Sequence, residues 1–156
     1  KVEPRHSMQR RGLLATMTSL AVLGSGCSSD SQSESLEPVE NPPDWLTAGD
    51  ECESSSADGY LNLTGRKDDV ADSIAVVEFE RLSEESQLMV RFEVQHEIAK
   101  TCTDASGFST LLAEIDNMGR DPYREEHGER PEATAIKVGN GYYEIIRMVV
   151  YDQVLE

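Results

Sequence analysis

Apolar and polar residues alternate in four stretches of the chain, and this period of two is typical of strands with one buried face. The alternation predicts strands over residues 59–64, 73–82, 133–138 and 142–154. The last two flank Gly139-Asn140-Gly141. An Asn-Gly step between such runs predicts a tight hairpin, because both of its turn positions need positive φ.

Residues 83–97 carry two conflicting patterns. Ser83 followed by two glutamates is typical of a helix start, where a hydroxyl caps the first turn and acids lie at its positive end. Every second residue from Leu88 to Val94 is apolar, which instead indicates a strand. The passage Leu82–Gln87 resembles a strand-to-helix segment of small haloarchaeal proteins of unknown function, and this resemblance favours the helix.

A second helix is predicted from Phe108 to Met118, where apolar residues recur at spacings of three and four. Gly119 is placed to end it, and Arg120–Pro131 is expected to be a charged loop. The predicted fold is therefore α+β, a small antiparallel sheet with one or two helices on one face. A mostly-β sandwich is the alternative.

The N-terminal part has the three zones of an export signal: arginines at 10 and 11, an apolar run over 13–23, and small residues before Cys27. The run is about half of the roughly 20 residues that a helix needs to span a bilayer, which favours a removable signal over 8–26. Arg10 and Arg11 followed by Gly-Leu-Leu resemble a twin-arginine signal for folded proteins. Residues 1–7 precede Met8 and are expected to be a remnant outside the fold.

Gly24-Ser25-Gly26-Cys27 resembles a lipobox, the cleavage site of bacterial and archaeal lipoproteins. That resemblance implies that Cys27 becomes the first residue and carries a lipid. Leu23 stands one position earlier than the usual leucine, so ordinary signal-peptidase cleavage stays open. Residues 27–44 are rich in Ser and Glu and are expected to form a disordered tether, followed by one globular domain over 45–156.

The net charge of the chain restricts the kinds of molecule that it is expected to bind. The whole chain has a net charge of −16. Removing residues 1–26 takes four of its 14 basic and one of its 30 acidic residues, which leaves 10 and 29 and a net charge of −19. Such an acidic, lysine-poor composition, with the export signal, resembles a haloarchaeal surface lipoprotein. Salt screens the self-repulsion of such a surface, and the negative charge argues against nucleic acid as a partner.

Cys52 and Cys102 remain as an even pair if Cys27 is lipid-modified. In an exported protein such a pair predicts a structural disulfide. The alternative uses Cys102 as a nucleophile with His96 as its base. A free thiol would be exposed to oxidation outside the cell, which favours the disulfide.

Other short motifs supply little chemistry. The segment from His96 to Lys100 begins like the helix of a zinc protease, but Lys100 stands where the second imidazole should be. Asp116, Asn117 and Asp121 do not have the spacing of a calcium loop. Asn62 begins a sequon for N-glycosylation, which makes it a candidate glycosylation site if the chain is exported. No metal or cofactor is therefore assigned.

Two functions from different classes follow. The first is a lipoprotein anchored to the extracellular face of the membrane by Cys27, which acts as a non-enzymatic binding or accessory module, with a surface protein as a candidate partner. The second is a small extracellular enzyme that uses His96 or Cys102. A pocket that gathers both side chains would favour the enzyme.

Overall fold

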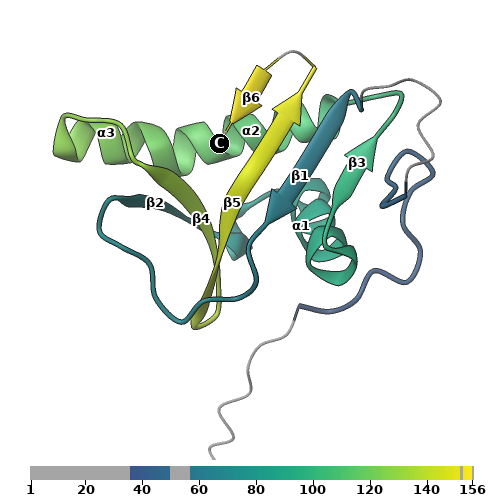
Figure 1. Ribbon diagram of the computed structural model, residues 1–156, viewed down its shortest axis with the longest axis horizontal. Coiled ribbons are helices and arrows are strands. Elements are labelled where there is room, and N and C mark those ends of the chain that lie inside the picture. The colour runs from purple at the N-terminus through teal and green to yellow at the C-terminus, as the bar shows by residue number, and fades with distance from the viewer. Residues whose placement is uncertain (1–35, 50–56, 152, 156) are drawn as a thin grey trace, which may run out of the picture. The chain divides into compact units, whose positions relative to one another are not determined.

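One sheet organises the fold of the computed structural model, which describes residues 36–49, 57–151 and 153–155 (Figure 1). Its strands follow the order β2-β4-β5-β1-β3, and β6 pairs with the end of β5. All pairings are antiparallel except that of β2 with β4, which is parallel. The strands are β1 Gly59–Leu63, β2 Ile74–Glu78, β3 Ala99–Thr101, β4 Ala133–Val138, β5 Gly141–Val150 and β6 Gln153–Leu155.

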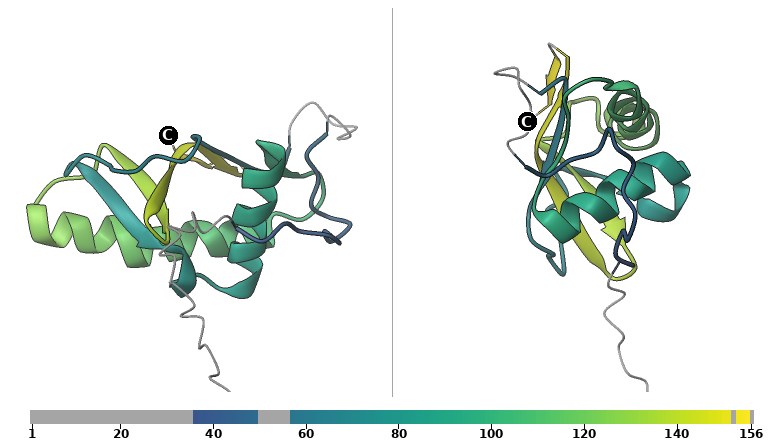
Figure 2. Two further views of the ribbon diagram at one scale, coloured as in Figure 1. Left: turned by 90° about the horizontal axis from the view of Figure 1, so that it is seen from below. Right: turned by 90° about the vertical axis from the view of Figure 1, so that its right-hand side faces the viewer.

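The helices lie on one face of this sheet, as the two views of Figure 2 show. Helix α1 (Glu84–His96) packs against β1 and β3, and α2 (Ser106–Ile115) packs against α1, β1 and β5. Beyond α2 the chain continues directly into the π-helix η2 (Asp116–Arg120) and then into α3 (Asp121–His127). The predicted α+β fold is confirmed, and the sandwich alternative is wrong.

The ambiguous segment at 83–97 is the helix α1. Ser83 caps it, since the Ser86 N–H donates to the Ser83 hydroxyl at 3.4 Å. The Ser83 N–H in turn donates to Glu114 of α2 at 3.1 Å, so a neighbouring helix supplies the second half of the cap. A short 3-10 helix, η1 (Phe79–Arg81), precedes it, and the predicted strand over 73–82 therefore ends at Glu78.

The helical layer after α2 differs from the prediction. Gly119 does not end a helix, because the chain stays helical through it and through most of the predicted charged loop. A Cβ on Gly119 would lie 2.6 Å from Val77 Cγ2, so glycine is needed here for close packing on β2. The stop is Gly128, which has φ 74 and donates its N–H to the Arg124 carbonyl.

The two hairpins also depart in detail from the sequence pattern. The β4–β5 turn residues are Gly139 and Asn140, because Val138 pairs with Gly141. Only Gly139 of these two has positive φ, the pattern of a type II′ turn instead of the type I′ turn of Asn-Gly. The single strand predicted over 142–154 is two strands, β5 and β6, which are separated at Tyr151, where φ is 52.

A β-bulge interrupts the pairing of β1 with β5. Asn62 pairs with Arg147 and Leu63 with Ile145, so Ile146 is an extra residue in β5. The Leu63 N–H donates to the carboxylate of Glu93 on α1 at 2.8 Å. A side chain of the helical layer thus completes the backbone hydrogen bonding next to the bulge.

Part of the predicted tether is packed on the domain. Leu36 and Val39 contact the hydrophobic core, and the Val39 N–H donates to Gln95 Oε1 of α1 at 2.8 Å. Thr47 forms an antiparallel bridge with Lys100, which extends the sheet beyond β3. These contacts hold residues 36–47 against the rest of the described chain.

The predicted export signal, the lipidation site Cys27 and the disulfide partner Cys52 lie outside the described residues. Among the residues that are described, none of the helices has the length and apolarity to cross a membrane.

Candidate functional site

Arginine side chains gather beside the continuous helix formed by α2, η2 and α3. Arg120 comes from η2, Arg124 from α3, and Arg130 from the segment after Gly128. They surround a hollow of about 250 Å3, which we call the arginine hollow. Its lining residues are Asp116, Arg120, Asp121, Arg124, Arg130 and Pro131.

Two of the three guanidinium groups are paired with aspartates of the same helix. Arg120 Nη1 donates to Asp116 Oδ1 at 2.8 Å, and Arg124 Nη2 donates to Asp121 Oδ1. Within the described part of the chain, Arg130 forms no ion pair. A guanidinium has five N–H donors, so these bonds leave most of the donors of the hollow unused by protein.

The π-helix explains how the hollow is built. The Asp121 N–H donates to the carbonyl of Asp116, five residues earlier, so the turn is wider than an α-helical one. Pro122 follows directly and has no N–H to offer, which the helix tolerates near the start of α3. Gly119 holds the opposite side of this turn against Val77. Short π-helices are frequent at functional sites.

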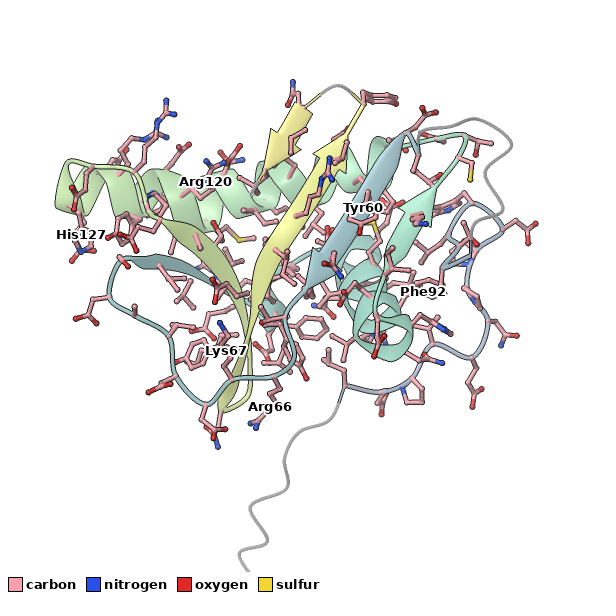
Figure 3. The ribbon with its side chains drawn as sticks, viewed as in Figure 1. Tyr60, Arg66, Lys67, Phe92, Arg120 and His127 are labelled. Atoms are coloured by element: carbon pink, nitrogen blue, oxygen red, sulfur yellow. The ribbon has the colours of Figure 1, made fainter. Side chains whose placement is uncertain are left out.

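Acidic groups gather around a different part of α3. The ring of Tyr123 stacks on His127 at 4.1 Å between centroids. Loss of contact with water, and after it the charges of Glu129, Glu132 and Asp72, raises the pKa of Tyr123. Figure 3 shows His127 below α3 and Arg120 above the helical layer. The acids that act on Tyr123 are therefore different from the aspartates that pair with the arginines.

The alternative site, with Cys102 as nucleophile and His96 as its base, is not formed. Cys102 is disulfide-bonded and has no thiol to ionise. Its predicted partner, Cys52, lies outside the described residues, so that pairing stays a prediction. His96 is the last residue of α1; it is exposed, and its ring lies 4.4 Å from that of Phe92 between centroids.

The remaining predicted residues have structural partners. Asn62 is half-buried in β1, and its Nδ2 donates to the Glu97 carbonyl at 2.9 Å, a bond with which a sugar on Nδ2 would compete. Asp116 and Asp121, whose spacing had argued against a calcium loop, pair with arginines in a helix. Across the described ranges, no three His, Cys, Asp or Glu residues are grouped so as to hold a metal ion.

One buried acid lies away from the arginine hollow. Glu93 on α1 is only 2% exposed. Burial raises its pKa and the nearby Glu97 adds to the rise, while hydrogen bonds from Leu63 and Asn62 act in the opposite direction. Because both partners belong to β1, we assign Glu93 a structural role in joining α1 to the sheet.

Sequence reasoning missed the arginine hollow because it ended the helix at Gly119. The signal was present in the spacing of the charges. Asp116 and Arg120 are four residues apart and Asp121 and Arg124 are three apart, as expected of ion pairs along one continuing helix. The position of Arg130 beside them depends on the turn at Gly128 and had no signal of its own.

Comparisons of the chain with protein families, with curated proteins and with solved structures found no significant match.

Proposed function

We propose that the chain is a lipoprotein anchored to the extracellular face of the cell membrane through Cys27, and that it acts as a non-enzymatic binding module. The anchor is supported by the arginines, the apolar run and the Gly-Ser-Gly-Cys sequence of residues 10–27. The acidic, lysine-poor composition supports a salt-rich exterior and argues against nucleic acid as a partner. A protein of the same surface remains a candidate partner.

The observation that carries the binding function is the chemistry of the arginine hollow. Its charged lining consists of guanidinium groups, which stay protonated in proteins, and of aspartates that are already paired with two of them. The lining has no Ser, Cys, His or Lys side chain to serve as a nucleophile or a proton carrier. Such a lining favours holding a ligand over transforming it.

The disulfide state of Cys102 supports the same proposal. A disulfide-bonded cysteine cannot attack a substrate, which removes one of the two residues on which the enzyme alternative depended. The other, His96, does not line the arginine hollow. No observation on the described residues favours the enzyme over the binding module.

The anchor is tested by the variant Cys27→Ser, compared with Ser28→Ala as a matched control next to it. We expect Cys27→Ser to move from the membrane fraction to the medium and Ser28→Ala to stay with the membrane. Mass spectrometry of the N-terminal peptide should find a lipid on Cys27 in the parent and in the control. A Cys27→Ser protein that stays in the membrane fraction as fully as the parent would contradict the anchor.

A further inference from the structure

We infer that the arginine hollow binds a phosphate group. This inference rests on the proposed binding function and deepens it by naming the class of ligand. Three guanidinium groups and two carboxylates line the hollow, so its lining carries a positive charge in a chain whose net charge is −16. A local excess of cations in so acidic a protein indicates an anionic ligand.

The donors of the hollow suit a tetrahedral oxyanion. A guanidinium is a planar fork that binds phosphate through two parallel hydrogen bonds, which a lysine cannot do. Arg120 and Arg124 each donate to one aspartate oxygen, and Arg130 is without an ion pair in the described part of the chain. Arg130 is therefore the side chain with the most donors left for a ligand.

The size and lining of the hollow restrict what is attached to the phosphate. About 250 Å3 is below the roughly 300–1,000 Å3 of sites for drug-sized ligands. Pro131 is the only apolar residue of the lining, which contains no aromatic side chain for a base to stack on. The hollow thus fits a phosphate group with a small polar substituent, and it does not suit a nucleotide.

The rival explanation is that the arginines only stabilise the helix. Ion pairs at spacings of three and four do so by a few tenths of a kcal/mol, and they account for Arg120 and Arg124. They do not account for Arg130, which lies outside α3 and beside the other two. The two explanations therefore differ most at Arg130.

The test uses the full chain with Cys27→Ser, which is free of lipid whether or not the natural protein is lipid-modified. Inorganic phosphate is titrated at constant total ionic strength by calorimetry. We expect saturable binding that Arg130→Gln weakens at least tenfold, because a charge-assisted hydrogen bond is lost. Arg147→Gln on β5 changes the net charge equally away from the hollow, and we expect it to leave the affinity within about twofold.

A second pair of variants tests the hollow in the opposite direction. Asp121→Asn releases Arg124 from its ion pair and should tighten phosphate binding several-fold. Asp68→Asn removes the same charge beside Arg66 and should change the affinity little. If Arg130→Gln and Arg147→Gln weaken binding equally, the attraction is unspecific and the inference is wrong.

The source of the phosphate is decided by a vesicle arm. The same proteins are sedimented with vesicles of phosphatidylglycerol and of phosphatidylcholine. Binding to phosphatidylglycerol that depends on Arg130, without binding of inorganic phosphate, assigns the site to a lipid headgroup, and the reverse result assigns it to a free phosphate compound. Absence of both contradicts the inference but leaves the membrane anchor untouched, since that is judged from fractionation of Cys27→Ser cells.

Discussion

The helical layer handles charge in two different ways at its two ends. At the contact of α1 with β1, Glu93 is buried, and its carboxylate accepts hydrogen bonds from Leu63 and the side chain of Asn62. No cation of the described chain lies within ion-pair distance of it. At the other end, three arginines lie at the rim of a hollow and outnumber the aspartates beside them.

This difference distinguishes charged groups that hold the fold together from charged groups that are candidates for binding a ligand. The Glu93 carboxylate has protein partners for its charge and no access to solvent, so it joins a helix to a strand. The arginine hollow is open and has donors left over. A buried and satisfied group has a role in the fold, whereas an open group with unused donors can accept water or a ligand.

Salt should have the largest effect on the stability of the fold. It should screen the surface charges and have little influence on the buried Glu93. The Debye length is about 3 Å at 1 M salt and about 30 Å at 0.01 M, and buried charges are screened much less. On transfer from molar potassium chloride to dilute buffer we expect the melting temperature to fall sharply or the fold to be lost. Repulsion summed over the acidic surface acts against a stability of only about 5–15 kcal/mol.

Acid should partly reverse that loss. Lowering the dilute buffer to about pH 4 protonates many of the carboxylates whose repulsion salt would have screened. Circular dichroism on melting reports both effects, and a salting effect on the hydrophobic core would give the first without the second. A melting temperature that is flat from dilute buffer to molar salt would refute the salt-adapted surface.

Truncation of the buried Glu93 should have the next largest effect on the free energy of unfolding. Glu93→Ala leaves the Leu63 N–H without its acceptor and opens a cavity, and we expect a loss of about 1–3 kcal/mol in the free energy of unfolding. Glu93→Gln keeps an oxygen for that N–H and should lose much less. Denaturant titration of both variants gives the comparison, and equal losses would show that the hydrogen bond to Leu63 has no role.

Gly119→Ala should destabilise the packing of η2 against β2, beside the arginine hollow. Its Cβ would meet Val77 Cγ2 at 2.6 Å, and overpacking of this kind costs about 1–3 kcal/mol. Gly65→Ala is the matched control, since its Cβ would meet nothing within 4 Å. Thermal melting of both variants gives the comparison. A Gly119→Ala protein as stable as the control would mean that η2 is not held closely against β2.

The ionisation of Glu93 should make the stability of the fold depend on pH. The pKa of Glu93 is raised in the folded chain, so the folded state binds its proton more tightly than the unfolded state, whose value is near 4.5. The cost of the buried charge is fully present above the folded pKa and disappears as pH falls from there toward 4.5. The stability of Glu93→Gln relative to the parent should therefore be highest near neutral pH and decline on acidification.

That decline is measured by denaturant titration of the parent and Glu93→Gln at several pH values in molar salt, where the surface acids are screened. Asp104→Asn is a useful contrast, because hydrogen bonds from Ser106 lower the pKa of Asp104. The stability of Asp104→Asn relative to the parent should therefore be lowest near neutral pH and rise on acidification. A pH-independent difference between Glu93→Gln and the parent would contradict the raised pKa.

The smallest expected effect on stability is at the hollow itself. Arg120→Gln breaks its half-exposed ion pair with Asp116 and should cost no more than about 0.5 kcal/mol. The same variant should weaken phosphate binding several-fold. A loss of stability comparable with that of Glu93→Ala would mean that the two ends of the helical layer do not differ as described.

Periodicity predicted most of the elements, because the helices cover only one face of the sheet. Along β1 and the first half of β5, buried residues alternate with partly exposed ones, and the sequences of these strands carry that alternation. The helix α1 was harder to predict because its residues also alternate, and the local signal that agreed with the structure was the capping hydroxyl of Ser83. Local chemistry was the better guide there because the Ser83 hydroxyl accepts from Ser86, only three residues further along the chain.

The sequence by itself determined the α+β class, the acidic surface, the signal-like N-terminal stretch and the existence of two helical regions. These follow from composition and from residue patterns that lie within a single helix or strand. Only the tertiary structure decided that Gly119 packs against Val77 instead of ending a helix, and that Arg130 joins Arg120 and Arg124. The reason is that a glycine looks the same in sequence whether it supplies positive φ or space for a neighbour, and only the fold distinguishes the two.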